Sequence, residues 1–301
     1  MVHIEAPCKI NVHLDIGEKR ADGLHELSSV FVALPLCDSL TVRLVPSGGG
    51  QPCALDVQNG GLPPELWAAA AVSRENIVLH AAALFRECAP LPALAVRLVK
   101  RIPAGAGLGG ASADAAAALL AFNRLLPPSA ALDSAALLAL AARLGSDVPF
   151  FLWALESSAA AEAAAVPCAR VGGTGERITP APPPFPLPFW TLLAHPGFFS
   201  GTARAYALLD TWRARLSQRA RRASSVDTAG GFFNSFLPAF LEDGSEEERR
   251  GYRAVLADIA RFQPLYHSIS GSGSVCFGIF DVEESAARAE RELQERWPWC
   301  R

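Results

Sequence analysis

The sequence of 301 residues lacks the marks of several protein classes. Its 27 Lys and Arg residues are offset by 30 Asp and Glu residues, so it has no basic excess of the kind that proteins carry when they bind nucleic acid. No apolar run reaches the roughly 18 residues of a membrane-spanning helix. Glu5 and Lys9 stand where a secretory signal would have a basic segment followed by an apolar one. We therefore expect a cytoplasmic protein that binds neither nucleic acid nor a membrane.

The seven cysteines include no CxxC pair, and no internal repeat is visible. An odd number of scattered cysteines fits neither a disulfide framework nor a zinc site, so we expect reduced thiols in the core and no residues dedicated to a metal. Half of the residues are apolar, and a chain of this length commonly divides into two domains, each with its own core.

Apolar periodicity predicts the elements along the chain. Residues 1–45 read as strands around a long polar turn, and residues 46–53 as a glycine-rich loop. Helices are expected over 76–88, 111–126, 134–144, 202–221, 246–261 and 283–297, and strands over 93–102, 190–196 and 274–280. A proline-rich segment at 180–189 marks the strongest change of composition. We expect an α+β fold with two domains, residues 1–160 and residues 161–301.

The segment IPAGAGLGGASADAAAALLAF places a glycine-rich turn directly before an alanine-rich helix. Gly105, Gly107 and Gly110 match the dinucleotide pattern G-x-G-x-x-G, but a proline separates the turn from the preceding strand. The same turn approaches the P-loop pattern, except that Ala111 occupies the lysine position. Both patterns share backbone amides at a helix N-terminus, which favour an anion. The alternative is a flexible turn followed by a capped helix, with Ser112 and Asp114 as favourable residues in its first turn.

Two distant segments change this balance. The segment SISGSGSVCFGIF sets two glycines between serines, and APCKINVHLDI places Lys9 in an otherwise apolar strand. Together with PAGAGLGGASADAA, they resemble the three motifs of the GHMP kinase superfamily. Within it, APCKINVHLDIGEKRADGLHEL, LGSDVPFFL, GTGERITP and HPGFFSGTARAY are similar to the kinases of 4-diphosphocytidyl-2-C-methyl-D-erythritol. The similarity runs in the same order over most of the chain.

The resemblance implies a two-domain GHMP kinase fold. Its N-terminal domain would be a ribosomal-protein-S5-like α/β domain and its C-terminal domain a ferredoxin-like α+β domain, with the active site in the cleft between them. The implied reaction is phosphorylation of the 2-hydroxyl group of that small-molecule substrate in non-mevalonate isoprenoid synthesis. ATP would be the donor, with Mg²⁺ bridging phosphate oxygens, and the enzyme would be a monomer or a weak homodimer.

Two other functions stay open. Another GHMP kinase, acting on mevalonate, homoserine or a sugar, is disfavoured by RADG-x-H together with GSDVPFF. A non-catalytic module that binds nucleotide or associates with RNA is disfavoured because both Lys9 and Asp147 are retained.

The resemblance assigns the catalytic and nucleotide residues. It makes Asp147 the general base and Lys9 the cation at the reacting groups, although a turn carboxylate and a solvated lysine would look alike in sequence. It puts Asn76 and Lys100 near the adenine, where they would otherwise pass as a helix cap and an exposed strand residue. The loop around the nucleotide phosphates would be Pro103, Ala104, Gly105, Ala106, Gly107, Leu108, Gly109, Gly110, Ala111 and Ser112.

On the acceptor side, the resemblance assigns His25 and Tyr206 to the cytosine, with Asn11, Gly271 and Ser272 also at the substrate. The family commonly has tyrosine before the histidine, whereas this chain has Leu24, so one ring of an aromatic sandwich is missing. The glycine loop departs as well, because Ala111 and Ala113 replace a glycine and a serine. Ser112 and the backbone amides then remain as the groups that contact phosphate.

Overall fold

The computed structural model describes residues 1–45, 52–71, 76–160, 166–219 and 231–301. Its contacts divide the chain into two compact units. Unit 1 comprises Met1–Lys9, Ala33–Ala104 and Gly109–Pro180, and unit 2 comprises Ile10–Val32, Gly105–Leu108 and Ala181–Arg301. The chain therefore passes from one unit to the other within its first two strands and again within the glycine loop.

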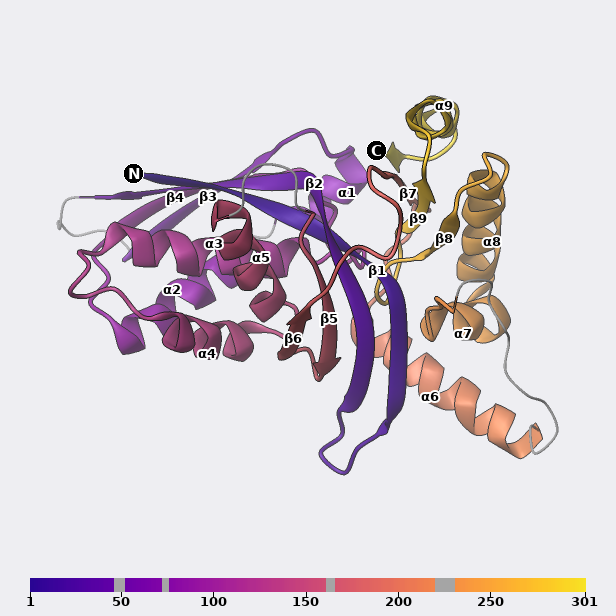
Figure 1. Ribbon diagram of the computed structural model, residues 1–301, viewed down its shortest axis with the longest axis horizontal. Coiled ribbons are helices and arrows are strands. Elements are labelled where there is room, and N and C mark those ends of the chain that lie inside the picture. The colour runs from indigo at the N-terminus through magenta and orange to yellow at the C-terminus, as the bar shows by residue number, and fades with distance from the viewer. Residues whose placement is uncertain (46–51, 72–75, 161–165, 220–230) are drawn as a thin grey trace. The chain divides into compact units, whose positions relative to one another are not determined.

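The larger sheet has the strand order β3-β4-β2-β5-β6, with β1 paired to β2 (Figure 1). β4 is antiparallel to β2 and parallel to β3. Alternate residues of β4 are buried, as expected for a strand with one face on the core. The bounds are β1 (Val2–Lys19), β2 (His25–Leu44), β3 (Cys53–Asn59), β4 (Leu94–Lys100), β5 (Cys168–Gly173) and β6 (Arg177–Pro180).

The helices α2 (Ile77–Cys88), α3 (Gly110–Leu125), α4 (Ser134–Leu144) and α5 (Val148–Ala160) gather on one side of β3 and β4 (Figure 1). The central one, α3, packs against the other three. Every residue from Ala113 to Phe122 is buried, because alanine lets neighbouring helices approach closely from all sides. Asn76 and Asp133 cap the helices that follow them by accepting hydrogen bonds from backbone amides. Unit 1 also contains α1 (Pro64–Ala70).

Unit 2 contains an antiparallel sheet of order β10-β7-β9-β8. Its core joins aromatic residues of the helices, such as Phe240 and Tyr252, to Leu14 and Ile16 from β1. The strands are β7 (Trp190–His195), β8 (Tyr266–Ile269), β9 (Cys276–Phe280) and β10 (Trp299–Cys300). The helices are α6 (Thr202–Arg219), α7 (Phe236–Asp243), α8 (Glu246–Ala260) and α9 (Glu283–Gln294).

The α+β class and the predicted helices and strands are confirmed, with ends that differ by a few residues. The polar turn is shorter than predicted, since only Arg20–Leu24 separate β1 from β2. The predicted loop at 46–53 lies mostly outside the described residues. The domain boundary at residue 160 adjoins 161–165, which also lie outside them, and it stays a prediction. Within the described ranges, none of the helices combines the length and the apolar character needed to cross a membrane.

Candidate active site

Lys9 and Asp147 come together in unit 1, as the motifs predicted. Lys9 Nζ lies 3.4 Å from Asp147 Oδ2, and the lysine side chain is only 4% exposed against 25% for the aspartate. Asp147 immediately precedes α5, and its carbonyl oxygen accepts a hydrogen bond from Phe151 N. Asp147 therefore lies at the N-terminal end of α5, with a side chain that is partly exposed to solvent.

The end of the glycine loop approaches this ion pair closely. Gly109 has a φ of +72°, in the left-handed region, and directly precedes α3. A Cβ atom at this position would lie 2.7 Å from the Phe151 ring and 3.3 Å from Lys9 Cε. Only glycine fits both the conformation and the space, so the loop backbone passes directly over the lysine.

Lys100 is buried, and its ammonium group is shared by two carboxylates. Lys100 Nζ donates to Asp114 Oδ2 at 2.6 Å and also to Asp38 Oδ2. The exposed fractions are 5% for Lys100, 2% for Asp114 and 0% for Asp38. Burial raises the pKa of Asp114 to about 7, because it outweighs the attraction of Lys100. The two carboxylates in turn raise the pKa of Lys100 despite its burial. Sequence reasoning missed Asp38, which lies in no motif.

The middle of the glycine loop belongs to unit 2. The carbonyl oxygen of Gly107 accepts from Ser270 Oγ at 2.8 Å, and that of Ala106 accepts from Val275 N at 3.2 Å. Ser270 Oγ also accepts from Asn11 N at 3.3 Å. The three predicted motifs therefore meet at the hydroxyl group of Ser270.

Gly271 and Ser272 lie in the same serine-glycine loop. Ser272 Oγ is 3.1 Å from Thr202 Oγ1. Asn234 Nδ2 donates to the carbonyl oxygens of Ile269 and Gly271 and thereby holds the loop. Sequence reasoning missed Asn234 because a single asparagine after two phenylalanines gives no periodic signal.

His25 and Tyr206 are brought together in unit 2, with ring centroids 5.2 Å apart. His25 Nδ1 lies 2.9 Å from the Gly17 carbonyl oxygen, and Nε2 lies 3.3 Å from Asp210 Oδ1. Leu24 is 53% exposed. Asp210 follows Tyr206 by four residues in α6, so the helical repeat was the signal that could have identified it.

A deeply buried histidine in unit 2 gives a test of pH dependence. His195 Nδ1 accepts from Gly197 N, and Nε2 lies 3.2 Å from Ser274 Oγ. Burial lowers the pKa of His195 from 6.5 to about 4. Between pH 6.5 and pH 4, this histidine is therefore protonated in the unfolded chain but neutral in the folded chain. The free energy of unfolding decreases as the pH falls through this range.

We expect the free energy of unfolding to be about 2 kcal/mol lower at pH 5 than at pH 8 on account of His195 alone. His195→Asn keeps an acceptor for the Gly197 amide and should remove this contribution, so that the change in unfolding free energy between pH 8 and pH 5 differs from that of wild type by about 2 kcal/mol. The measurement is urea unfolding across the pH range, with the exposed His80→Asn as control. If the free energy of unfolding varied with pH in the same way in wild type and in His195→Asn, the lowered pKa of His195 would be contradicted.

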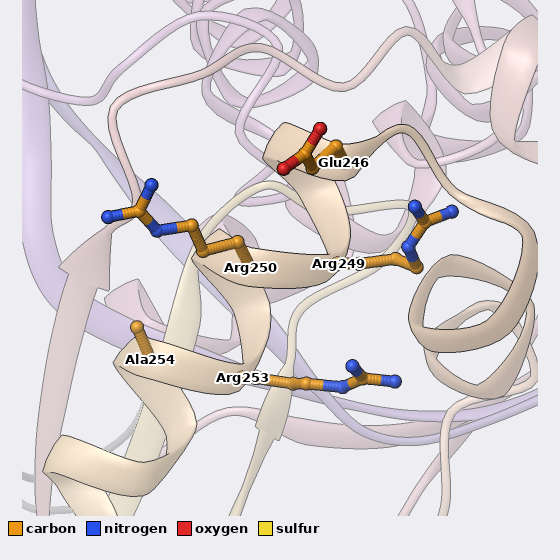
Figure 2. Close-up of a pocket in the computed structure, with 5 residues that line it drawn as sticks. All are labelled: Glu246, Arg249, Arg250, Arg253 and Ala254. Carbon is orange, nitrogen blue, oxygen red and sulfur yellow. The ribbon is translucent and has the colours of Figure 1, made fainter.

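The pocket drawn in Figure 2 lies along α8 and is lined by arginines. Arg249 and Arg253 point to the same side of the helix, and Arg250 points to the other (Figure 2). Arg249 donates to the Gly244 carbonyl oxygen and Arg253 to that of Leu241. These carbonyls close the C-terminal end of α7, so two of the arginines serve as cap donors.

Two family models match the chain. The model of the GHMP kinases N terminal domain matches residues 76–154, which include the glycine loop and Asp147. The model of the GHMP kinases C terminal matches residues 230–298, which include the serine-glycine loop. Both describe GHMP kinases, the class that the fold and the three motifs define.

Curated relatives match almost the whole chain. The 4-diphosphocytidyl-2-C-methyl-D-erythritol kinase of Treponema pallidum (strain Nichols) is 37% identical over 99% of this chain and 96% of its own length. The protein of that name from Pelobacter propionicus is 33% identical over 98% and 95%. The chain therefore belongs to the family of the 4-diphosphocytidyl-2-C-methyl-D-erythritol kinases.

Solved structures agree with this assignment. The crystal structure of 4-(cytidine 5'-diphospho)-2C-methyl-D-erythritol kinase matches with a TM-score of 0.71 and 31% identity, over 100% of this chain and 97% of that one. The Methanococcus jannaschii mevalonate kinase matches with a TM-score of 0.61 but 12% identity, over 100% of this chain and 98% of that one. The second likeness shows the shared fold alone.

Proposed function

We propose that this chain transfers the γ-phosphoryl group of ATP to the 2-hydroxyl group of 4-diphosphocytidyl-2-C-methyl-D-erythritol, giving the 2-phosphate and ADP. The observation that carries the proposal is the 37% identity, over 99% of the chain, to a kinase named for this substrate. The ion pair between Lys9 and Asp147 supports it, because a non-catalytic module has no need of a buried cation beside an accessible carboxylate. We further propose that the chain acts in the cytoplasm as a monomer or weak homodimer.

The chemistry follows from the ion pair. The 2-hydroxyl oxygen attacks the γ-phosphorus atom, ADP leaves with the electron pair of the broken bond, and Asp147 takes up the hydroxyl proton. Lys9, held beside it, stabilises the negative charge that develops on the transferred group. Asn11 follows Lys9 by two residues in β1 and is proposed to contact the acceptor.

On the nucleotide side, we propose that the backbone amides of Gly105–Ser112 and the start of α3 bind the phosphates. Asn76, which caps α2, is proposed to lie near the adenine. Mg²⁺ would supply neutralisation of the phosphate charge. Among the described residues no group of three or more acidic, histidine or cysteine side chains could hold a metal ion. The half-buried Ser112 is the hydroxyl that the loop offers to it.

On the acceptor side, we propose that the base binds beside His25 and Tyr206, whose rings already contact each other. Gly271 and Ser272 are proposed to contact the remainder of the acceptor. Leu24 immediately precedes His25 and is largely exposed, which leaves room for a larger side chain.

Leu24→Tyr is expected to tighten acceptor binding several-fold without lowering the melting temperature. An aromatic pair adds roughly 0.5 to 1.5 kcal/mol beyond area burial, and 1.4 kcal/mol is about tenfold in affinity. Tyr206→Ala should weaken acceptor binding more strongly than it does in relatives with a tyrosine before the histidine. The measurements are acceptor KM and Kd, with ATP parameters unchanged.

Leu265→Tyr, at another exposed leucine, is the control for the added ring. If Leu24→Tyr had the melting temperature of wild type and an unchanged acceptor affinity, residue 24 would not contact the bound base.

The experiment that tests the function is ADP release by the purified protein with ATP and single acceptors. We expect turnover with 4-diphosphocytidyl-2-C-methyl-D-erythritol and none with mevalonate or homoserine. Turnover with either of the latter would assign another GHMP kinase. Calorimetric binding of ATP without ADP release for any acceptor would favour a non-catalytic module.

A further inference from the structure

The two ends of the glycine loop emerge from one buried cluster in unit 1. β4 ends at Lys100, three residues before the loop, and α3 begins at Gly110, so Asp114 follows the loop exit. Asp38 comes from β2, the antiparallel neighbour of β4. The cluster therefore takes one residue from the entry of the loop, one from its exit and one from the sheet beneath.

Each hydrogen bond in the cluster ties one of these ends down. Asp38 Oδ1 accepts from the backbone amides of Arg101 and Ile102, the latter at 2.9 Å, and so fixes the entry. Asp114 fixes the exit through its bond to Lys100 Nζ. Because Lys100 also donates to Asp38, one ammonium group joins both ends to the sheet.

The charge balance explains why the cluster is sensitive to change. Two carboxylates share one ammonium group, all three are nearly inaccessible, and Asp114 Oδ1 finds no hydrogen-bond partner among the described residues. Apolar side chains of similar size would pack here at a lower cost in stability. The cluster is thus better suited to fixing geometry than to stabilising the fold.

We propose that Asp38, Lys100 and Asp114 form a clamp that holds the glycine loop in the shape that binds nucleotide phosphates. Lys100 is then a positioning residue that does not itself contact the nucleotide. A glycine-rich segment loses more backbone entropy on ordering than other segments. Fixing its two ends in advance lowers the entropy cost of ordering the loop when the nucleotide binds. The proposal rests on the proposed function only in assuming that this loop binds ATP.

The test measures binding of a non-hydrolysable ATP analogue by calorimetry, beside melting temperature. Asp114→Ala removes the exit tether, and it leaves Lys100 and Asp38 as a balanced pair. We expect it to weaken analogue binding by about tenfold, equivalent to 1.4 kcal/mol. Asp281→Ala, at an exposed aspartate, is the matched control. Unchanged analogue affinity in Asp114→Ala would overturn the proposal.

Lys100→Met supplies the second arm. It leaves two buried carboxylates facing each other and should weaken analogue binding by at least as much as Asp114→Ala. In Lys100→Met/Asp114→Asn, the new amide can donate to Asp38 Oδ2, and binding should recover to within about threefold of wild type. A folded double variant that binds as poorly as Lys100→Met would mean that Lys100 contacts the nucleotide directly. Wild-type protein that binds no analogue would instead contradict the proposed function.

Discussion

Asp147→Asn is expected to lower turnover by about two to four orders of magnitude, the range for loss of a general base, while fold and ATP binding persist. Asparagine has the shape of aspartate but cannot take up the hydroxyl proton. The backbone bond from Phe151 N to the carbonyl oxygen of residue 147 is unaffected, so α5 should begin at the same place. The measurements are kcat from ADP release, melting temperature and calorimetric ATP binding.

Asp133→Asn is the matched control, because Asp133 also precedes a helix and caps it with its side chain. Asparagine caps helices as well as aspartate does, so this variant should resemble wild type. Turnover near the wild-type rate in Asp147→Asn would remove the base assignment.

Lys9→Met is expected to lower kcat by about two to three orders of magnitude, the range for loss of one preorganised electrostatic contact. Methionine fills much of the space of the buried lysine stem, so the fold should persist. ATP binding should change much less than kcat, since the charge acts at the reacting group. Single-turnover measurements separate the two effects.

Lys9→Arg should not restore activity. The close approach of Gly109 to Lys9 Cε leaves too little room for a guanidinium group. Arg43→Met, at an exposed residue of β2, is the control for loss of a basic charge. A collapse of ATP affinity at an unchanged kcat would make Lys9 a nucleotide anchor instead.

Periodicity predicted the long elements because their apolar pattern is written in consecutive residues. α3 is an example, since its alanine run is buried throughout. Most of the missed elements are short and depend on partners elsewhere in the chain, as β3 does on β4 and α7 on α8. A segment of seven or eight residues carries too few periods to be distinguished from a loop. The exception is α5, which has 13 residues and was missed because its apolar residues begin as a consecutive run, VPFFLWAL, with no helical period.

The site was predicted unevenly for a related reason. Lys9 and Asp147 lie in recognisable motifs, and the structure brings them together. Lys100 resembled an exposed strand residue, yet it is buried because Asp38 and Asp114 supply the charge that balances it. Asp38 has no signature of its own, since its role depends on backbone amides more than 60 residues away in sequence.

The interleaving of the two units limits how this protein can be divided. Leu14 and Ile16 contribute to the core of unit 2, and Ile16 N donates to Ser235 Oγ. Residues 10–32, the ends of β1 and β2 that face each other across the turn, form a hairpin that belongs to unit 2. A fragment that begins after Pro180 would lack this hairpin and expose the apolar surface that the hairpin covers. Recombination between relatives at a single crossover would likewise pair a hairpin from one parent with a core from the other. Chimeras that retain a matched core must therefore exchange residues 10–32 together with the C-terminal segment.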